Sequence, residues 1–518
     1  MTTNVHPETL ESEKMEIAKY IGDQYWRLNN LYYILDKDGH EILFKMNGSQ
    51  EKFYWDMWYM NLILKDRQRG FSTLIAIYIL DTCLFNDGTA AGIVDITLPD
   101  AKKKLAKISY AYERIPDFLK QTVPLTTDAK EAIEFANGSS IYAATSHRGG
   151  TLQILHISEM GKIAVRFPER AREIRTGALN TLKAGNIIFN ESTAEGNAGE
   201  FYEDCQSARV IAETGAKLTA LDYRFHFFGW WEGSENEMDP DGVFISPEVD
   251  KYCDDLEKNL AIQINSRKRA WYMKKSTQQK DDMQREFPGT PDEAFAAAIE
   301  GVYLSKALKH LREHGQICDL PIDKQYPLNT GWDYGLSDHM TIWIHQRVGF
   351  VERLVGYMSG ADDDVLYYWA ELQKRYSSFT WGYHFLPHDF GHQRGGTAKD
   401  SASPPRTLQQ ILIADGMSDS FIIPRIDHKG TAINEVKIWL PSAYVDPKKC
   451  AEGVKCLMNF RREWDDLNGC WKERPRHDWA MHGYDGLETL VRGINAYGCK
   501  GKIGDKSGET YYSRKRIG

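Results

Sequence analysis

The stretch Lys65–Thr73, with the sequence KDRQRGFST, decides the fold of the first half of the chain. It lies between the apolar run Asn61–Leu64, which is typical of a buried strand, and the helix-length stretch Ser72–Phe85. A strand, a glycine-bearing loop and a helix N-terminus form a cradle for phosphate, because unpaired backbone N–H groups and the helix dipole both face the anion. An ordinary turn between a strand and a helix is the alternative interpretation.

The loop departs from the usual pattern G-x-x-x-x-G-K-S/T at two positions. Asp66 stands where the first glycine belongs, and Phe71 stands where the lysine belongs. Another cation must therefore neutralise the phosphates; we expect Lys65 at the strand end to do so, with Arg67 as the alternative. We expect Ser72 to hold magnesium. The predicted nucleotide-binding residues of this segment are Lys65, Arg67, Gln68, Arg69, Gly70, Phe71, Ser72 and Thr73.

A second motif, LQILHISEMGK at Leu152–Lys162, predicts a buried strand that ends in Ser158 and Glu159. A P-loop ATPase needs one carboxylate to hold Mg²⁺ and another to polarise the attacking water. Ser158 replaces the usual first aspartate, so Glu159 is the candidate catalytic base. The alternative is a surface glutamate that follows a buried strand.

Strand-like runs alternate with helix-length stretches through this half of the chain. The run Asn186–Asn190 is followed by Glu191 and by Ser192 and Thr193, hydroxyl residues placed to sense a γ-phosphate. The run Gly92–Thr97 supplies a further strand. This alternation predicts an α/β fold with a mostly parallel sheet.

The second half begins with three strand-like runs joined by short turns, after a segment of charged helical sequence. The runs are Thr330–Tyr334, Met340–Gln346 and Phe350–Met358. Helices and strands alternate after them. Three meandering strands followed by alternating helices and strands is the order of the ribonuclease H-like fold.

Three aspartates stand where such a fold could bring them together. Asp333 lies in the first strand, the strand Tyr383–Pro387 runs into Asp389, and Asp485 is expected on the first turn of an amphipathic helix. Like charges in a buried cluster raise each other's pKa, and divalent cations relieve the conflict. Two Mg²⁺ or Mn²⁺ ions about 4 Å apart would then support phosphodiester hydrolysis. Surface exposure of each aspartate is the alternative; Asp338, His388, Asp478 and His482 are candidate accessory groups.

Four segments in this order resemble the ATPase half of the large terminase subunits of tailed bacteriophages, which are DNA-packaging motors. They are KDRQRGFSTL, HISEMGK, FNESTAEGNAGEFYE and FPGTPDEAF. The region Thr330–Tyr497 is similar to the terminase nuclease domain. The resemblance implies that Gln50 reads the adenine and that Arg148 is an arginine finger that acts in trans.

The resemblance further implies a motor that uses ATP with one Mg²⁺ to drive double-stranded DNA into a procapsid, and a nuclease that cuts concatemers with two Mg²⁺ or Mn²⁺ ions. The implied partners are a portal protein, a small terminase subunit and further copies of the chain, with a pentamer expected. The implied location is the host cytoplasm, with transient docking on the procapsid and absence from the mature virion.

Two rival hypotheses remain. A cellular DNA-repair ATPase-nuclease should carry helicase motifs that read a DNA strand, and the sequence shows none. In a non-catalytic scaffold, Phe71 and Ser158 would mark a dead nucleotide site.

Charge and composition limit the class of protein. A net charge of -9 argues against a protein that coats nucleic acid by bulk charge. Leu74–Leu80, the longest apolar stretch, is far shorter than the roughly 20 residues of a membrane span. Eight scattered cysteines form no disulfide framework, so we expect a reducing cytoplasm and no membrane contact.

The expected parts are a P-loop ATPase domain with an N-terminal helical arm (1–227), a helical linker (228–325), a ribonuclease H-like nuclease domain (326–499) and a basic, flexible tail (500–518).

Overall fold

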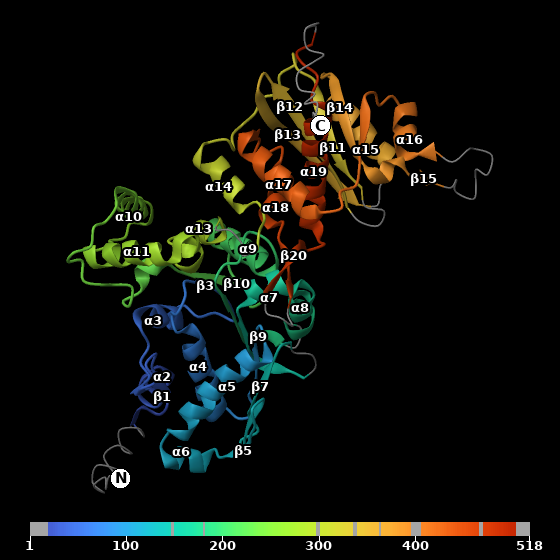
Figure 1. Cartoon of the computed structure of the whole chain (residues 1–518). Helices are drawn as coiled ribbons and strands as arrows, with labels where there is room; N and C mark the ends of the chain where they lie inside the picture. Colours follow the sequence, from blue (N-terminus) through green and yellow to red (C-terminus); the bar gives the residue numbers. More distant parts are fainter. Residues whose placement is uncertain are drawn as a thin grey trace. The chain divides into compact units, whose positions relative to one another are not determined.

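The computed structural model describes residues 19–146, 150–179, 182–296, 301–334, 339–361, 364–394, 406–465 and 470–503. The chain divides into two compact units, Met1–Ala297 and Ala298–Gly518, each with one large sheet (Figure 1). Arg148, Asp338 and the tail from residue 504 onward lie outside the described residues. None of the helices in the described ranges combines the length and the apolar character that a bilayer crossing requires.

The first unit is built on an eight-stranded sheet with the order β10-β3-β9-β8-β4-β7-β6-β5. The strands from β10 to β7 are parallel, which confirms the predicted parallel-type sheet, while β6 and β5 extend it in antiparallel pairing. Strands β3, β9 and β8 are neighbours and run parallel, so their carboxyl ends meet at the same edge of the sheet. The bounds are β3 (Met60–Lys65), β4 (Ala90–Val94), β5 (Leu125–Asp128), β6 (Ala132–Phe135), β7 (Ser140–Ala144), β8 (Leu152–Ser158), β9 (Leu182–Ser192) and β10 (Tyr223–Phe228).

Helices cover this sheet, and the most deeply buried is α4 (Phe71–Phe85). Its sequence FSTLIAIYILDTCLF is apolar on almost every side, so it can pack both on the sheet and beneath other helices. Asp81 lies inside α4, where its carboxylate accepts bonds of 2.9 and 2.8 Å from Arg27 and one of 2.6 Å from the Tyr32 hydroxyl. The other helices of this part are α2 (Gln24–Asn30), α3 (Gly48–Trp55), α5 (Leu98–Glu113), α6 (Asp117–Thr122), α7 (Met160–Arg166), α8 (Pro168–Glu173) and α9 (Glu200–Thr214).

The segment after β10 forms a small helical group with its own core of aromatic and aliphatic side chains. The charged sequence over Asp250–Gln279, expected to be helical, forms two helices, and Ala261 between them adopts a left-handed conformation (φ 53°). Glu293 fixes the FPGTPDEAF turn by accepting bonds from the Gly289 N–H (2.7 Å) and the Tyr252 hydroxyl (2.9 Å). These helices are α10 (Pro247–Leu260), α11 (Ser266–Gln279), α12 (Met283–Glu286) and α13 (Pro291–Ala296).

The second unit is built on a six-stranded sheet with the order β17-β14-β11-β12-β13-β18. Strands β11, β12 and β13 form the predicted antiparallel meander, and β14 and β17 join it in parallel, which confirms the ribonuclease H-like order. The sixth strand, β18, was not predicted from the sequence. The bounds are β11 (Leu328–Asp333), β12 (His339–Val348), β13 (Val351–Ala361), β14 (Trp381–Pro387), β17 (Ser420–Ile423) and β18 (Ala443–Val445).

The helix α19 (Trp479–Tyr497) lies close against the middle of this sheet. A Cβ atom added to Gly331 of β11 would come within 2.3 Å of Leu490 Cβ and 2.7 Å of the Gly486 carbonyl oxygen, so only glycine permits this approach. The other helices of the unit are α14 (Ser305–Glu313), α15 (Val365–Arg375), α16 (Leu408–Ala414), α17 (Lys429–Trp439) and α18 (Ala451–Asn459).

We predict that Asp81→Asn destabilises the first unit by about 3 to 5 kcal/mol, because the change leaves the Arg27 guanidinium buried with a weakened partner. Hydrogen exchange of the α4 amides in the full chain measures the effect. Asp117→Asn is the control, since the side chain of Asp117 is 86% exposed beside Lys120 and such pairs contribute little. Equal exchange rates in the two variants would contradict the prediction.

Candidate functional sites

The loop between β3 and α4 is held in shape by Gln50. The Gln50 side-chain amide donates to the Gly70 carbonyl (2.9 Å), and its oxygen accepts from the Asn47 N–H (2.9 Å). Gly70 has a φ of 75° and precedes the first residue of α4; a Cβ atom there would lie 2.8 Å from the Gln50 nitrogen. Gln50 is therefore placed at the loop, where both ends of its amide are engaged within the chain.

Lys65 ends β3 beside a buried carboxylate. Its Nζ lies 3.4 Å from Glu191 Oε2, and the two side chains are 8% and 0% exposed. Burial would lower the pKa of Lys65, but the carboxylates of Glu191 and Glu159 raise it above its ordinary value. The structure thus brings a charged ammonium group to the cradle at the position expected for it.

The two arginines of the loop are paired with groups of the protein itself. Arg67 pairs with Glu286. Arg69 is buried and bonds to Asp66 and to the Gly229 carbonyl. Its guanidinium is therefore a structural support for the loop.

The remaining loop residues have distinct surroundings. Phe71 is fully buried, and its ring lies edge-on to Phe53 with the centroids 5.5 Å apart. Gln68 adopts a left-handed conformation (φ 65°). The Thr73 hydroxyl accepts a bond of 3.0 Å from Lys107, which sequence reasoning did not identify.

Glu191, at the end of β9, lies at the centre of this site. Its Oε1 accepts from the hydroxyls of Ser72 and Ser158, the latter at 3.2 Å, and lies 3.1 Å from His156 Nε2. Burial alone would raise the pKa of Glu191, but Lys65 and His156 hold it well below its usual range. Sequence reasoning assigned Glu191 no role; the signal that could have found it was the missing aspartate at Ser158 on the neighbouring strand.

Glu159 is the N-cap residue just before α7 and has a left-handed conformation (φ 60°, ψ 38°) that is uncommon for a residue with a side chain. Its carboxylate pairs with Lys162 at 2.7 Å. Burial opposes ionisation, but Lys65 and Lys162 hold the pKa of Glu159 below its ordinary value. A carboxylate with a lowered pKa is in the proton-accepting form.

Ser192 and Thr193 pack on the first turn of α7, the helix that follows Glu159. The Gly161 N–H donates to Ser192 Oγ at 3.0 Å. A Cβ atom at position 161 would lie 2.8 Å from the Thr193 carbonyl oxygen and 2.9 Å from Ser192 Oγ. The glycine therefore allows the segment predicted to sense phosphate to touch the helix that carries the candidate base.

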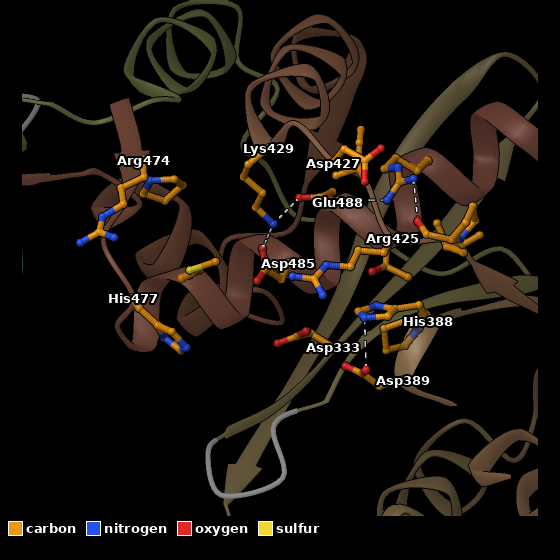
Figure 2. A pocket seen from close by; sticks show the side chains of 18 of the residues that line it. Asp333, His388, Asp389, Arg425, Asp427, Lys429, Arg474, His477, Asp485 and Glu488 are labelled. Carbon is orange, nitrogen blue, oxygen red and sulfur yellow. Dashed lines mark hydrogen bonds and ion pairs between the residues drawn. The ribbon is translucent and has the colours of Figure 1, made fainter. Parts of the chain in front are cut away.

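The second site is a cavity of ≈ 820 Å³ in the second unit (Figure 2). Asp333 from the end of β11, Asp389 from the turn after β14 and Asp485 from α19 all line it. The structure therefore brings the three predicted aspartates to one space. The expectation for Asp485 was wrong in one detail, because α19 begins at Trp479 and Asp485 lies in its second turn.

Histidines contact two of these carboxylates. His482 Nδ1 lies 3.3 Å from Asp333 Oδ2. His388 and His392 lie 3.2 and 3.5 Å from Asp389 Oδ1. Asp478 instead caps the N-terminus of α19 by accepting from the Ala480 N–H.

Lys429 of α17 supplies a positive charge that sequence reasoning missed. Its Nζ lies 2.5 Å from Asp485 Oδ1 and 2.6 Å from Glu488 Oε2. Burial, together with the nearby charge of Asp333, raises the pKa of Asp485 to about 7, against the opposing effect of Lys429. The mutual repulsion of Asp333 and Asp485 and their hard oxygen ligands suit a divalent cation. Further basic groups on the cavity wall, Arg425, Arg474, His477 and Arg492, suit a phosphate chain.

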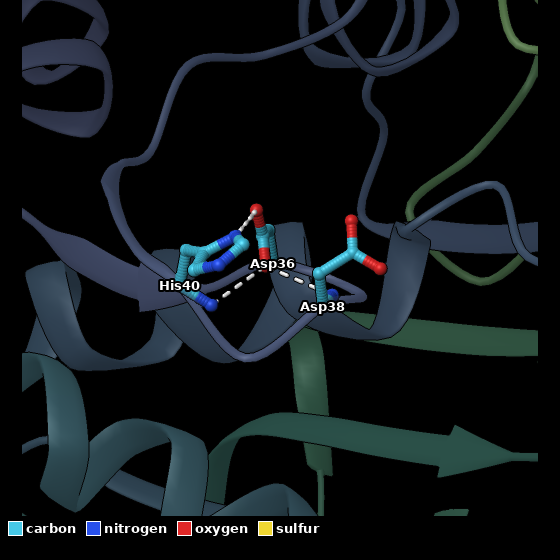
Figure 3. A group of neighbouring side chains, drawn as sticks. All are labelled: Asp36, Asp38 and His40. Atoms are coloured by element: carbon cyan, nitrogen blue, oxygen red, sulfur yellow. Dashed lines mark hydrogen bonds and ion pairs between the residues drawn. The ribbon is translucent and has the colours of Figure 1, made fainter.

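A third group, in the turn between β1 (Tyr33–Leu35) and β2 (Glu41–Leu43), has a structural explanation (Figure 3). Ligand atoms of Asp36, Asp38 and His40 lie within 4.8 Å of one another. Asp36 Oδ1 accepts from the backbone N–H groups of Asp38 (2.9 Å) and His40 (2.8 Å), so its carboxylate forms the turn.

Neither a protein-family model nor a curated protein matches the chain. Solved structures of phage proteins are similar to it. The large terminase of bacteriophage HK97 is 14% identical, with 91% of this chain and 99% of that chain covered and a TM-score of 0.43. The ATPase domain of the Thermus phage P74-26 large terminase is 14% identical over 48% of this chain and 94% of that one, with a TM-score of 0.32. The nuclease domain of the P22 large terminase is 14% identical over 35% and 87%, with a TM-score of 0.25.

We predict that Gly161→Ala destabilises the first unit by about 1 to 3 kcal/mol, because a methyl group would collide with the backbone of Thr193. Thermal unfolding of the full chain, followed by hydrogen exchange of the α7 amides, measures the change. The matched control is Gly48→Ala, where a Cβ atom meets nothing within 4 Å. Indistinguishable behaviour of the two variants would show that the contact does not constrain the site.

Proposed function

We propose that this chain is the large subunit of a viral terminase, a motor that hydrolyses ATP to move double-stranded DNA and a metal-dependent endonuclease that cuts it. The observation that carries the proposal is the convergence of Asp333, Asp389 and Asp485 on one cavity. This acidic site is in a different unit from the phosphate cradle, so the chain holds the two chemistries that packaging and cutting require.

In the first unit, the loop from Asp66 to Gly70 and the N-terminus of α4 receive the phosphates of ATP. Lys65 neutralises them in place of the lysine that Phe71 displaces. Ser72 contacts the Mg²⁺ that accompanies the nucleotide, and Glu159 accepts a proton from the attacking water or orients it.

The segment that follows β9 senses the state of the nucleotide. Ser192 and Thr193 touch α7, the helix that follows Glu159, so a shift at the γ-phosphate reaches that helix directly. Gln50 holds the loop through its bond to the Gly70 carbonyl. Its amide must leave Gly70 before it can contact adenine. Arg148 acts as a finger toward a neighbouring copy of the chain.

In the second unit, Asp333, Asp389 and Asp485 would hold two metal ions. When bound, Mg²⁺ or Mn²⁺ would supply an activated water and stabilise the leaving 3′ oxygen. Lys429 holds Asp485 in place while the site is free of metal, and Arg425 and His477 face the same cavity and orient the DNA backbone.

The partners and location follow from the resemblance of the motifs. They are double-stranded DNA, a portal protein and a small terminase subunit, with five copies of the chain acting on a procapsid in the host cytoplasm and none retained in the mature virion. A DNA-repair ATPase-nuclease would share both chemistries and is distinguished by failure to bind a portal. The burial of Phe71 beside Phe53, with Lys65 at the cradle, favours a working nucleotide site over a dead scaffold.

We predict that Asp333→Ala, Asp389→Ala and Asp485→Ala each abolish DNA cleavage and leave ATP hydrolysis near the wild-type rate, because the two sites belong to separate units. Nicking of plasmid DNA in Mn²⁺ is the assay. Asp419→Asn is the control, since Asp419 pairs with Lys500 and does not line the cavity. Undiminished cleavage by any of the three variants would remove that residue from the site.

We predict that Lys65→Ala loses ATP hydrolysis and keeps metal-dependent nicking, because no other ammonium group ends β3. Arg67→Ala should retain most turnover, since its guanidinium pairs with Glu286. Phe71→Leu should be tolerated, because the ring packs in the core. Phosphate release measured for all three decides the question: wild-type turnover in Lys65→Ala with loss in Arg67→Ala would reverse the assignment.

A further inference from the structure

A carboxylate is missing at the end of β8, and another fills its place from the adjacent strand. Ser158 stands where the metal-holding aspartate was expected. Glu191 of β9 is the direct partner of Ser158 in the parallel register of the two strands. In-register residues of adjacent strands extend from the same face of a sheet. The carboxylate of Glu191 therefore lies one strand away from position 158, on the same face of the sheet.

The contacts of Glu191 match the position of a metal-holding group. Its Oε1 accepts from Ser72, the hydroxyl expected to contact the nucleotide's cation, and from Ser158 at 3.2 Å. One carboxylate therefore links the two positions that should flank the ion. Glu159 faces Lys162 and remains available as the base.

The second oxygen of Glu191 lacks a hydrogen bond. Oε2 is buried and has no hydrogen-bond partner among the described residues, although Lys65 Nζ lies 3.4 Å away. A buried carboxylate oxygen left without a hydrogen bond is costly. A cation bound in the cradle would relieve that cost.

We propose that Glu191, together with Ser72, holds the divalent cation of the bound nucleotide, and that Lys65 is thereby released to the phosphates. The inference rests on the proposed ATPase function. Mg²⁺ keeps several of its waters when it binds protein, so contact through a water is sufficient. The alternative is that Glu191 is only the structural counter-ion of Lys65.

Glu191→Gln in the full chain separates these roles, because the amide keeps the size and an acceptor oxygen but loses the charge. Binding of a fluorescent, non-hydrolysable ATP analogue is measured across a Mg²⁺ titration and in EDTA. We expect the Mg²⁺ concentration for half-maximal tightening to rise at least about tenfold, as when other groups that hold a metal are removed. Binding in EDTA should not weaken.

Restoring the carboxylate on β8 gives the second arm. Ser158→Asp combined with Glu191→Gln should recover the Mg²⁺ dependence, because position 158 is in register with position 191. The control is Glu293→Gln, a buried carboxylate whose partners are Gly289 and Tyr252. Its Mg²⁺ titration should match that of the wild type.

The outcomes are distinguishable. Wild-type Mg²⁺ dependence in a folded Glu191→Gln protein overturns this inference and leaves the ATPase proposal intact. No binding of the analogue by the wild-type chain overturns the ATPase proposal. If Glu191→Gln fails to fold, Glu191→Asp replaces it: a shorter carboxylate should still raise the Mg²⁺ requirement, and an unchanged requirement overturns the inference.

Discussion

The buried pairing of Lys65 with Glu191 is the interaction on which the first site depends. It joins the ends of β3 and β9, and through Ser158 it reaches β8. Two opposite charges taken out of water each need a counter-charge, and here each supplies the other's, since an unpaired charge is costly in a medium of low dielectric constant. The edge of the sheet is therefore fixed by electrostatics as well as by its backbone ladder, and the loop between β3 and α4 begins from that fixed edge.

In the second unit the charges at the site are alike, so its acidic groups repel one another. Close packing of α19 on β11 forces Asp485 toward Asp333, and Gly331 makes that packing possible. Lys429 offsets part of the repulsion. The acidic cavity is thus maintained by the hydrophobic packing of a helix, whereas the end of β3 beside the loop is maintained by attraction between charges.

The sequence predicted the elements that carry a clear period and missed those specified by distant partners. The runs at β3 and β8 and the meander of the second unit were found because their apolar residues are continuous or alternate. The short β18 gave no such signal, and the edge strand β10 was not predicted although aromatic residues alternate with Arg224 and His226 along it. Only helical character was predicted for Asp250–Gln279, and its division at Ala261 gave no signal because the left-handed residue is not a glycine.

At the two sites, the sequence predicted which residues take part more often than it predicted which groups they contact. The three aspartates line one cavity of the second unit, and Lys65 ends β3 in the first unit, as the order of the motifs suggested. Arg69 was expected at the phosphates, but burial against Asp66 is a tertiary effect that no local pattern encodes. Lys429 and Glu191 were missed for the same reason, since their importance comes from partners far along the chain.

The left-handed backbone of Glu159 has a consequence for how this protein can change. A residue with a Cβ atom in that conformation costs roughly 1 kcal/mol or more relative to glycine. Glycine or asparagine at position 159 would relax the turn and favour folding, but either would remove the carboxylate from the cradle. Selection for stability alone would therefore drive this position away from glutamate, so a screen for thermostable variants would tend to recover well-folded chains without a carboxylate at this position.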